Sequence, residues 1–362
     1  MIQPTLLSNL VAAPEFIGKA IKASTPSDIR GLLAELPIVS EEEYNWDEEN
    51  PQKGWQPGKF HWVPVGRDRG NSGRIKQAST PINPIAERTV NGMEAIIELA
   101  RGRELLVDAN APAPLTPRDA VSRYFQIPPL DQLPKLDKSE ASKAIRVWAR
   151  ELARQVRVRV LFDKSSREFT IGIEDDGIGQ TPDMIHKTLL SLGTTTKADK
   201  FYLIGVFGQG GSSAYSECEY SWVISRRAKD LLGGHPDGAG WTIIKRIYPI
   251  DRRDDYFAYL ACTPDGRVPF ISQADADAAK IGNGTRFVHI AYDFGRGGSA
   301  ISMQLYRSLN HVLYNPVLPF ELSVSGTDAT VYGNGYRLSN LTSEKSKPPL
   351  DKVFPAQPII VQ

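Results

Sequence analysis

The sequence predicts an α+β fold, in which helices are combined with strands that pair mainly as antiparallel hairpins. Two observations carry this prediction. A helix-like segment over residues 139–155 leads directly into two alternating apolar runs joined by a short turn, which is the pattern of a hairpin. Further strand-like runs follow residue 220 without the regular intervening helices that a doubly wound parallel sheet requires.

The composition limits the classes of protein to which the chain can belong. With 362 residues, of which 41% are hydrophobic, the chain is long enough to bury a sizeable core. A formal net charge of +1 argues against nucleic-acid binding through a bulk positive field. The only cysteines, Cys218 and Cys262, fit a reducing compartment, and no apolar run approaches the length of a membrane span. We therefore expect a cytoplasmic protein without a membrane segment.

Residues 1–80 are expected to form an N-terminal extension, because they are rich in proline, tryptophan and acidic residues and carry weak periodicity. Its rings would either pack on their own domain or form a dimerisation arm; they are Tyr44, Trp46, Trp55, Phe60 and Trp62. A helix is predicted next, over residues 85–100, since Asn83 can cap it and Pro84 suits its first turn.

The middle of the chain combines an insertion with the hairpin. Residues 108–137 are interrupted by prolines and are predicted to be an inserted loop with one short helix near residues 118–125. The helix over 139–155 then leads into strands 156–160 and 169–173, which a turn at 164–167 connects. Another helix is expected to open at Thr181 and to end at Gly193.

The remaining elements complete the sheet. Strands are predicted at 220–225, 241–248, 256–262 and 286–292, followed by a helix over 301–314 and a strand over 320–324. We accordingly divide the chain into the extension 1–80, a main domain 81–300 with the insertion at 108–137, and a C-terminal helix–strand segment 301–362.

Two glycine-containing clusters indicate a nucleotide site. The first is Glu174-Asp175-Asp176-Gly177-Ile178-Gly179, which ends an apolar strand, and the second spans Gly205 to Gly211. A carboxylate at a strand end can hold a polar ring, and a glycine-lined turn can receive phosphates. The clusters fit neither a dinucleotide fingerprint, which needs one parallel strand–helix unit, nor a P-loop, whose lysine-containing pattern does not occur.

Four patterns occur in the order that is typical of the GHKL ATPase superfamily, and the chain resembles that family over residues 81–326. The family includes type II topoisomerase ATPase subunits, ninety-kilodalton heat-shock chaperones, histidine kinases, MutL and microrchidia ATPases. The patterns are Glu87-x-x-x-Asn91-x-x-Glu94, Asp175-x-Gly177-x-Gly179, Gly205-x-x-Gly208-x-Gly210 and Gly284-Thr285. The resemblance implies a two-layer sandwich of the Bergerat type, with helices on one face of a mixed, mainly antiparallel sheet.

The first pattern implies the catalytic chemistry. Glu87, Asn91 and Glu94 lie at i, i+4 and i+7, so a helix would place them on one stripe. By resemblance, Glu87 is the general base that activates water, and Asn91 is the ligand of Mg²⁺, whose remaining ligands would be phosphate oxygens and waters. Glu94 stands where the family usually has aspartate and is placed with the nucleotide-binding residues.

The other patterns imply the nucleotide contacts. By resemblance, Asp175 accepts a hydrogen bond from the adenine amino group, and Thr285 completes the polar network around the ring. Gly177 and Gly179 would allow the base to approach the backbone, whereas the amides of Gly205, Gly208 and Gly210 would converge on the phosphates. Residues 193–204 resemble a short ATP lid of the microrchidia kind. Lys197 within it is the expected phosphate contact.

The expected function is therefore Mg²⁺-dependent ATP hydrolysis that drives a nucleotide-gated, dimeric switch or clamp. DNA transactions, chaperone-like work on a protein client and antiviral defence are all compatible with this expectation. Two alternatives remain open at this stage: a protein kinase of the same superfamily, and a non-catalytic nucleotide-binding module. In the chain itself, the separation of the first two patterns by about eighty residues is more than the family usually has, which favours reading residues 108–137 as an insertion.

Overall fold

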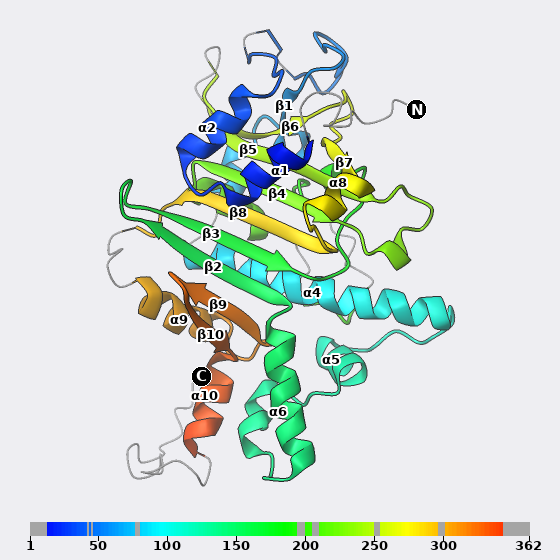
Figure 1. Cartoon of the computed structure of the whole chain (residues 1–362), viewed down its shortest axis with the longest axis vertical. Coiled ribbons are helices and arrows are strands. Elements are labelled where there is room, and N and C mark those ends of the chain that lie inside the picture. The colour runs from blue at the N-terminus through cyan, green and yellow to red at the C-terminus, as the bar shows by residue number, and fades with distance from the viewer. Residues whose placement is uncertain are drawn as a thin grey trace.

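The computed structural model describes residues 13–41, 43–44, 46–76, 80–193, 200–204, 210–249, 254–295 and 301–342. It confirms the α+β class: helices combine with a mainly antiparallel sheet (Figure 1). The strands are β1 (His61–Pro64), β2 (Val156–Asp163), β3 (Glu168–Asp175), β4 (Tyr220–Arg226), β5 (Gly238–Ile247), β6 (Tyr256–Ala261), β7 (Phe270–Ser272), β8 (Gly284–Tyr292), β9 (Phe320–Val324) and β10 (Thr327–Val331).

Ten α-helices lie within the described residues. They are α1 (Ala13–Lys22), α2 (Pro26–Ala34), α3 (Ser72–Ile75), α4 (Ile82–Val107), α5 (Pro117–Phe125), α6 (Glu140–Ala153), α7 (Ile185–Thr188), α8 (Gln273–Ala278), α9 (Ile301–Val312) and α10 (Gly333–Thr342). Short 3₁₀ helices are η2 (Val65–Arg67), η3 (Leu130–Lys135), η4 (Gly210–Glu217) and η5 (Lys229–Leu231).

The described strands form one ten-stranded sheet in the order β1-β6-β5-β4-β8-β3-β2-β9-β10, and β7 pairs with β5. All its pairs are antiparallel except that of β2 with β9. The predicted hairpin is β2–β3, whose register opposes Val156 to Asp175. Because side chains alternate between the faces of a strand, Val156, Val158 and Val160 point to the same face of the sheet, and all three are buried.

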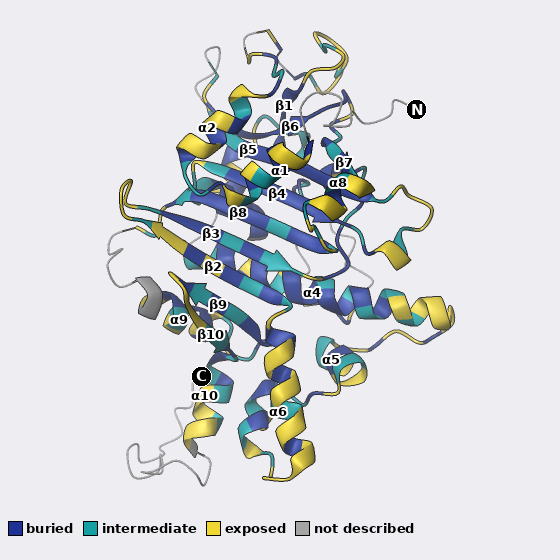
Figure 2. Cartoon of the chain, in the orientation of Figure 1, coloured by how far each residue is buried: buried dark blue, intermediate teal, exposed yellow. Residues whose placement is uncertain are grey.

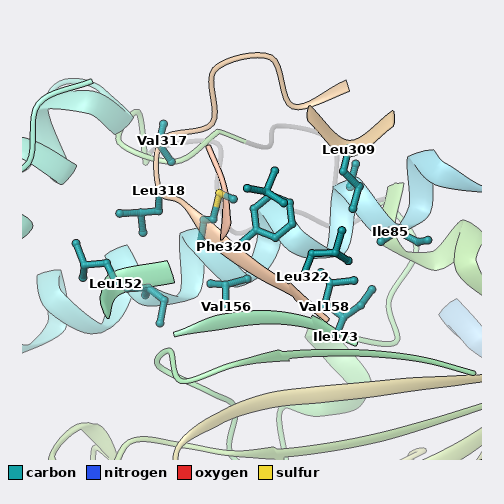
Figure 3. Close-up of a cluster of buried hydrophobic side chains, with 14 of the residues drawn as sticks. Ile85, Leu152, Val156, Val158, Ile173, Leu309, Val317, Leu318, Phe320 and Leu322 are labelled. Atoms are coloured by element: carbon teal, nitrogen blue, oxygen red, sulfur yellow. The ribbon is translucent and has the colours of Figure 1, made fainter. Parts of the chain in front are cut away.

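Helix α4 covers this face of the sheet. Its apolar stripe, including Ile85, Met93 and Ile97, is buried, and it is longer than the predicted 85–100. Figure 3 shows the core around it, where Val156, Ile173 and Phe320 of the sheet meet Leu152 of α6 and Leu309 of α9. The parallel strand β9 therefore extends the same core toward the C-terminal segment.

The opposite face is also covered over half of the sheet, so the prediction of helices on one face only is wrong there. Helices α1, α2 and α8 lie over β4, β5, β6 and β8 (Figure 1). Figure 2 shows the outer side of α1 and α2 exposed while the strands beneath are buried. Phe16 of α1 packs on Trp241 of β5 with ring centroids 5.1 Å apart, and Trp222 and Ile224 join the same cluster.

The described residues before 81 are built into this fold. Strand β1 pairs with β6 as one edge of the sheet. Four of the five predicted extension rings are buried, and Trp55 stacks on His61 with ring centroids 3.7 Å apart; the buried ones are Tyr44, Trp46, Phe60 and Trp62. Of the two alternatives considered for these rings, packing within their own chain is the one observed.

Candidate functional site

Three of the sequence patterns meet at one cavity of about 180 Å³ between α4 and the sheet. Asn91 and Glu94 line it from α4, Asp175 and Gly179 from the end of β3 and the turn after it, and Thr285 from β8. These residues are brought together because β8 pairs with β3, opposing Thr285 to Asp175, while α4 packs against β3 and β2.

Gly92 allows α4 to come close to Asp175. A Cβ atom on Gly92 would lie 3.3 Å from the Asp175 Cβ and 3.2 Å from Val156, so a side chain here would require a neighbour to shift by a few tenths of an ångström. The helix residue that faces the strand end is thus a glycine, with the polar Asn91 and Glu94 on either side of the contact.

The Asp175 carboxylate is the acceptor at the base of this cavity. It accepts a hydrogen bond at 2.9 Å from the Gly177 backbone N–H. Burial raises the pKa of Asp175 to about 7, and the hydrogen bond from Gly177 opposes that rise. The neighbouring Asp176 carboxylate adds to the increase, although Asp176 itself is turned outward to a bidentate pair with Arg157 at 2.6 and 2.7 Å. A carboxyl group so placed can change protonation state near neutral pH.

The two glycines after Asp175 are required by the chain's own backbone. A Cβ atom on Gly177 would lie 2.5 Å from the Ala95 backbone of α4, and one on Gly179, which has φ +62°, would lie 1.8 Å from the Arg226 carbonyl oxygen. The turn is fixed further because the Ile178 N–H donates to the Ala95 carbonyl at 3.0 Å. Close packing of turn, helix and strand therefore explains both glycines without a ligand.

Thr285 belongs to a buried hydroxyl network. Its Oγ1 lies 2.9 Å from the Ser225 Oγ, and that oxygen also accepts from the Gln180 N–H at 2.9 Å. Sequence reasoning missed Ser225, although its place at the end of the predicted strand 220–225, antiparallel to the strand of Thr285, is the signal that could have found it. The network holds Thr285 in place beside Asp175.

The three polar residues of the α4 stripe lie in different environments. Glu94 is buried, and its Oε1 accepts a hydrogen bond at 2.6 Å from the Ile204 N–H, which ties the end of the expected lid to α4. Asn91 is exposed and lines the cavity. Glu87, one turn earlier, is exposed and is not among the residues that line it.

Several predicted contacts lie outside the described residues. Lys197, Gly205 and Gly208 belong to this group, so the structure does not place them. Gly210 begins η4, and Gly211 and Ser212 after it line the cavity. Sequence reasoning also missed Arg88, a buried cation on α4 that lines the same cavity.

The sequence was compared with known protein families and with curated proteins. No model of a known protein family matches the chain, and no curated protein matches its sequence.

Within the described residues, no three His, Cys, Asp or Glu side chains gather as a metal-binding group. None of the described helices is both long and apolar enough to cross a membrane.

Proposed function

We propose that this protein binds and hydrolyses ATP with the help of Mg²⁺. The observation that carries the proposal is the single cavity lined by Asn91 and Glu94 of α4, by Asp175 and Gly179, and by Thr285. These residues come from patterns spread over about 200 positions, and a chance assortment of turn glycines and acidic residues would not be expected to converge.

The adenine ring would be recognised at Asp175. An ionised carboxylate accepts from the exocyclic amino group of adenine, whereas guanine presents a carbonyl oxygen at the corresponding position and would leave two acceptors facing each other. The Thr285 hydroxyl, held by Ser225, supplies a second polar contact beside it.

The residues present also fit Mg²⁺ and phosphate. Asn91 lines the cavity, and its amide oxygen can ligate a metal whose other ligands are phosphate oxygens and waters. Bound Mg²⁺ would neutralise charge on the phosphates during transfer. Glu87 lies one turn from Asn91 on α4, and we assign it the orientation and deprotonation of the attacking water.

A non-catalytic nucleotide-binding module is the second candidate. One observation favours it: Glu87 is exposed and does not line the cavity, although Asn91 and Asp175 do. The two functions differ in a single measurable property, since a binding module would show the same nucleotide affinity without turnover.

The proposal is tested by calorimetric titration of ATP and GTP together with phosphate release. Wild-type protein should prefer ATP, and Asp175→Asn should abolish that preference because the amide replaces an acceptor by a donor. Asp176→Asn, which removes the adjacent exposed carboxylate, is the control and should keep ATP affinity. Glu87→Ala should retain binding and lose about 10²–10⁴-fold in turnover. Equal ATP affinity in the wild type and Asp175→Asn would refute the proposed adenine contact, and turnover unaffected by Glu87→Ala would refute its catalytic role.

The wider role is also proposed, as a nucleotide-gated dimeric switch acting on DNA or on a protein client. This step rests on the family resemblance alone. Four of the five rings expected in a dimerisation arm, Tyr44, Trp46, Phe60 and Trp62, are buried within their own chain.

A further inference from the structure

Arg88 is a buried cation that the proposed chemistry does not use. Only 7% of its surface is exposed, and two of its guanidinium nitrogens, Nε and Nη2, are buried without a hydrogen-bond partner among the described residues. No ion pair with a described carboxylate is formed by this side chain either, in contrast to the equally buried Arg226, which pairs with Asp237 at 2.9 Å. A buried charge without a counter-ion costs several kcal/mol unless something compensates it.

Aromatic rings compensate Arg88 in part. Its Cζ lies 3.6 Å from the ring centroid of Phe287 on β8 and 5.1 Å from that of Tyr215 in η4. A desolvated cation–π contact stabilises the charge but does not replace the hydrogen bonds that five N–H groups can donate. The Tyr215 hydroxyl is likewise buried and has no hydrogen-bond partner among the described residues. The surroundings therefore hold the guanidinium while leaving its hydrogen-bonding capacity unused.

The position of Arg88 relative to the adenine contact matches the layout of a nucleotide. Gly92 faces Asp175, and Arg88 precedes it by one helical turn, about 6 Å along the axis. At this level the cavity is bordered by Gly211, where an added Cβ would lie 3.4 Å from the Arg88 Nη1 and 3.3 Å from the Asn91 Nδ2. Arg88 and the proposed magnesium ligand thus border the same part of the cavity, on the side of Gly92 toward the helix N-terminus.

We propose that Arg88 is the anion-binding residue of this cavity and donates hydrogen bonds to a phosphoryl group of the bound nucleotide. The guanidinium would turn from its aromatic stack toward Gly211, and the charge of the phosphoryl group would replace the missing counter-ion. This inference rests on the proposed function, since it deepens the assignment of the same site. Arginine suits the task better than lysine because its planar fork can hold two phosphate oxygens at once.

The test compares three probes, namely ATP, adenosine and inorganic tripolyphosphate, by calorimetry and, for weak binding, by ligand-detected NMR. In Arg88→Met, which keeps an apolar chain against Phe287, we expect ATP and tripolyphosphate affinities to fall about 10- to 100-fold, as for loss of a hydrogen bond to a charged group. Adenosine affinity should stay unchanged. Lys187→Met removes a charge from an exposed residue lining the same cavity and controls for bulk electrostatics; it should have a smaller effect.

Arg88→Lys keeps the charge and carries the test if Arg88→Met does not fold, which thermal unfolding would reveal; it should lose several-fold in ATP and tripolyphosphate affinity only. Three outcomes would overturn the role of Arg88 and leave the proposal of ATP binding intact. They are unchanged ATP affinity in the folded Arg88 variants, equal losses of affinity for ATP and adenosine, and an effect of Lys187→Met as large as that of Arg88→Met. If the wild type binds tripolyphosphate through Arg88 but binds ATP no more tightly than tripolyphosphate, the proposed function is refuted. Arg88 would then still be an anion-binding residue. Binding of none of the three probes would refute both.

Discussion

Asp175 and Asp176 are adjacent carboxylates with different environments. Asp176 is exposed and paired with Arg157, whereas Asp175 sits at the cavity with its pKa raised to about 7 by burial. The difference arises from strand alternation followed by the turn, which directs consecutive side chains to opposite sides. The two aspartates therefore differ in burial and in hydrogen-bond partners, so the same substitution at each of them can be compared directly.

The pKa of Asp175 predicts a pH-dependent penalty on folding. Because its pKa is higher in the folded protein than the usual 3.8, the folded state binds a proton more tightly, and this stabilisation is lost as the pH rises through about 7. Asp175→Asn should therefore increase the free energy of unfolding at pH 8 by about 1–3 kcal/mol and have little effect near pH 4. Urea unfolding at both pH values measures this.

Asp176→Asn is the control for this experiment. It loses the bidentate pair with Arg157 and should show no gain at pH 8. The burial argument fails if Asp175→Asn is no more stable than the wild type at pH 8, or if its gain is as large at pH 4.

At the scale of elements, the site depends on how closely α4 approaches the turn after β3. Gly92 and Gly177 permit this approach from the helix and from the turn, and the Ile178 N–H donates to the Ala95 carbonyl across it. Glu94 anchors Ile204 from the same helix. Helix α4 is thus the element that positions Asp175, the cavity and the end of the expected lid together.

Gly177→Ala should separate these elements. Its Cβ would lie 2.5 Å from the α4 backbone, a contact that cannot be relieved by a side-chain rotation, and we expect a loss of about 1–3 kcal/mol in stability together with weaker ATP binding. Denaturant unfolding and ATP titration would measure both effects.

Gly172→Ala, on β3 just before this turn, is the control, since the nearest neighbour of its Cβ would be Arg159 at an ordinary 3.9 Å. If both alanine variants were equally stable, close approach of α4 would not be what requires Gly177.

At the scale of the whole molecule, the described elements before residue 81 contribute to the core. Helices α1 and α2 cover one face of the sheet, and β1 forms its edge. Removing residues 1–55 would therefore expose the apolar surface of β4, β5 and β8, so such a truncation would test folding and could not isolate an effect on dimerisation.

A substitution tests the proposed dimer without disturbing this core. Glu87 is exposed on α4, so replacing it should not disturb the core. Because Glu87→Ala should block ATP hydrolysis, it should keep the protein in its ATP-bound state. If that state favours the dimer, ATP with Mg²⁺ should shift the equilibrium by the difference in ATP affinity between dimer and monomer. We expect light scattering to report twice the apo mass at micromolar concentrations. The same mass with ADP, with ATP and without nucleotide would contradict gating and leave the binding site untouched.

The local pattern of the chain determined much of the sheet and its main helix. The alternation of apolar and polar residues predicted the strands β2 to β6, β8 and β9 to within a few residues. Runs such as Val156–Val160 show this alternation because every second side chain of a strand points to the buried face. The cap and apolar stripe identified α4, although it extends to Val107. The helix predicted from Thr181 to Gly193 was wrong in extent, since only Ile185–Thr188 is helical. Helices α1, α2, α3, α8 and α10 were not predicted; each is ten residues or shorter, and short helices depend on tertiary packing.

For the candidate site too, some properties follow from the sequence and others only from the tertiary structure. The sequence by itself determined that Asn91, Glu94, Asp175 and Thr285 were its candidates, since residue type and order are local properties. Only the tertiary structure decided that they line one cavity, that Ser225 orients Thr285, and that Arg88 is buried with two nitrogens that no described residue hydrogen-bonds. The physical reason is that pairing of β3 with β8 and packing of α4 join positions far apart in sequence, and burial, pKa and unsatisfied hydrogen bonds exist only once those contacts form.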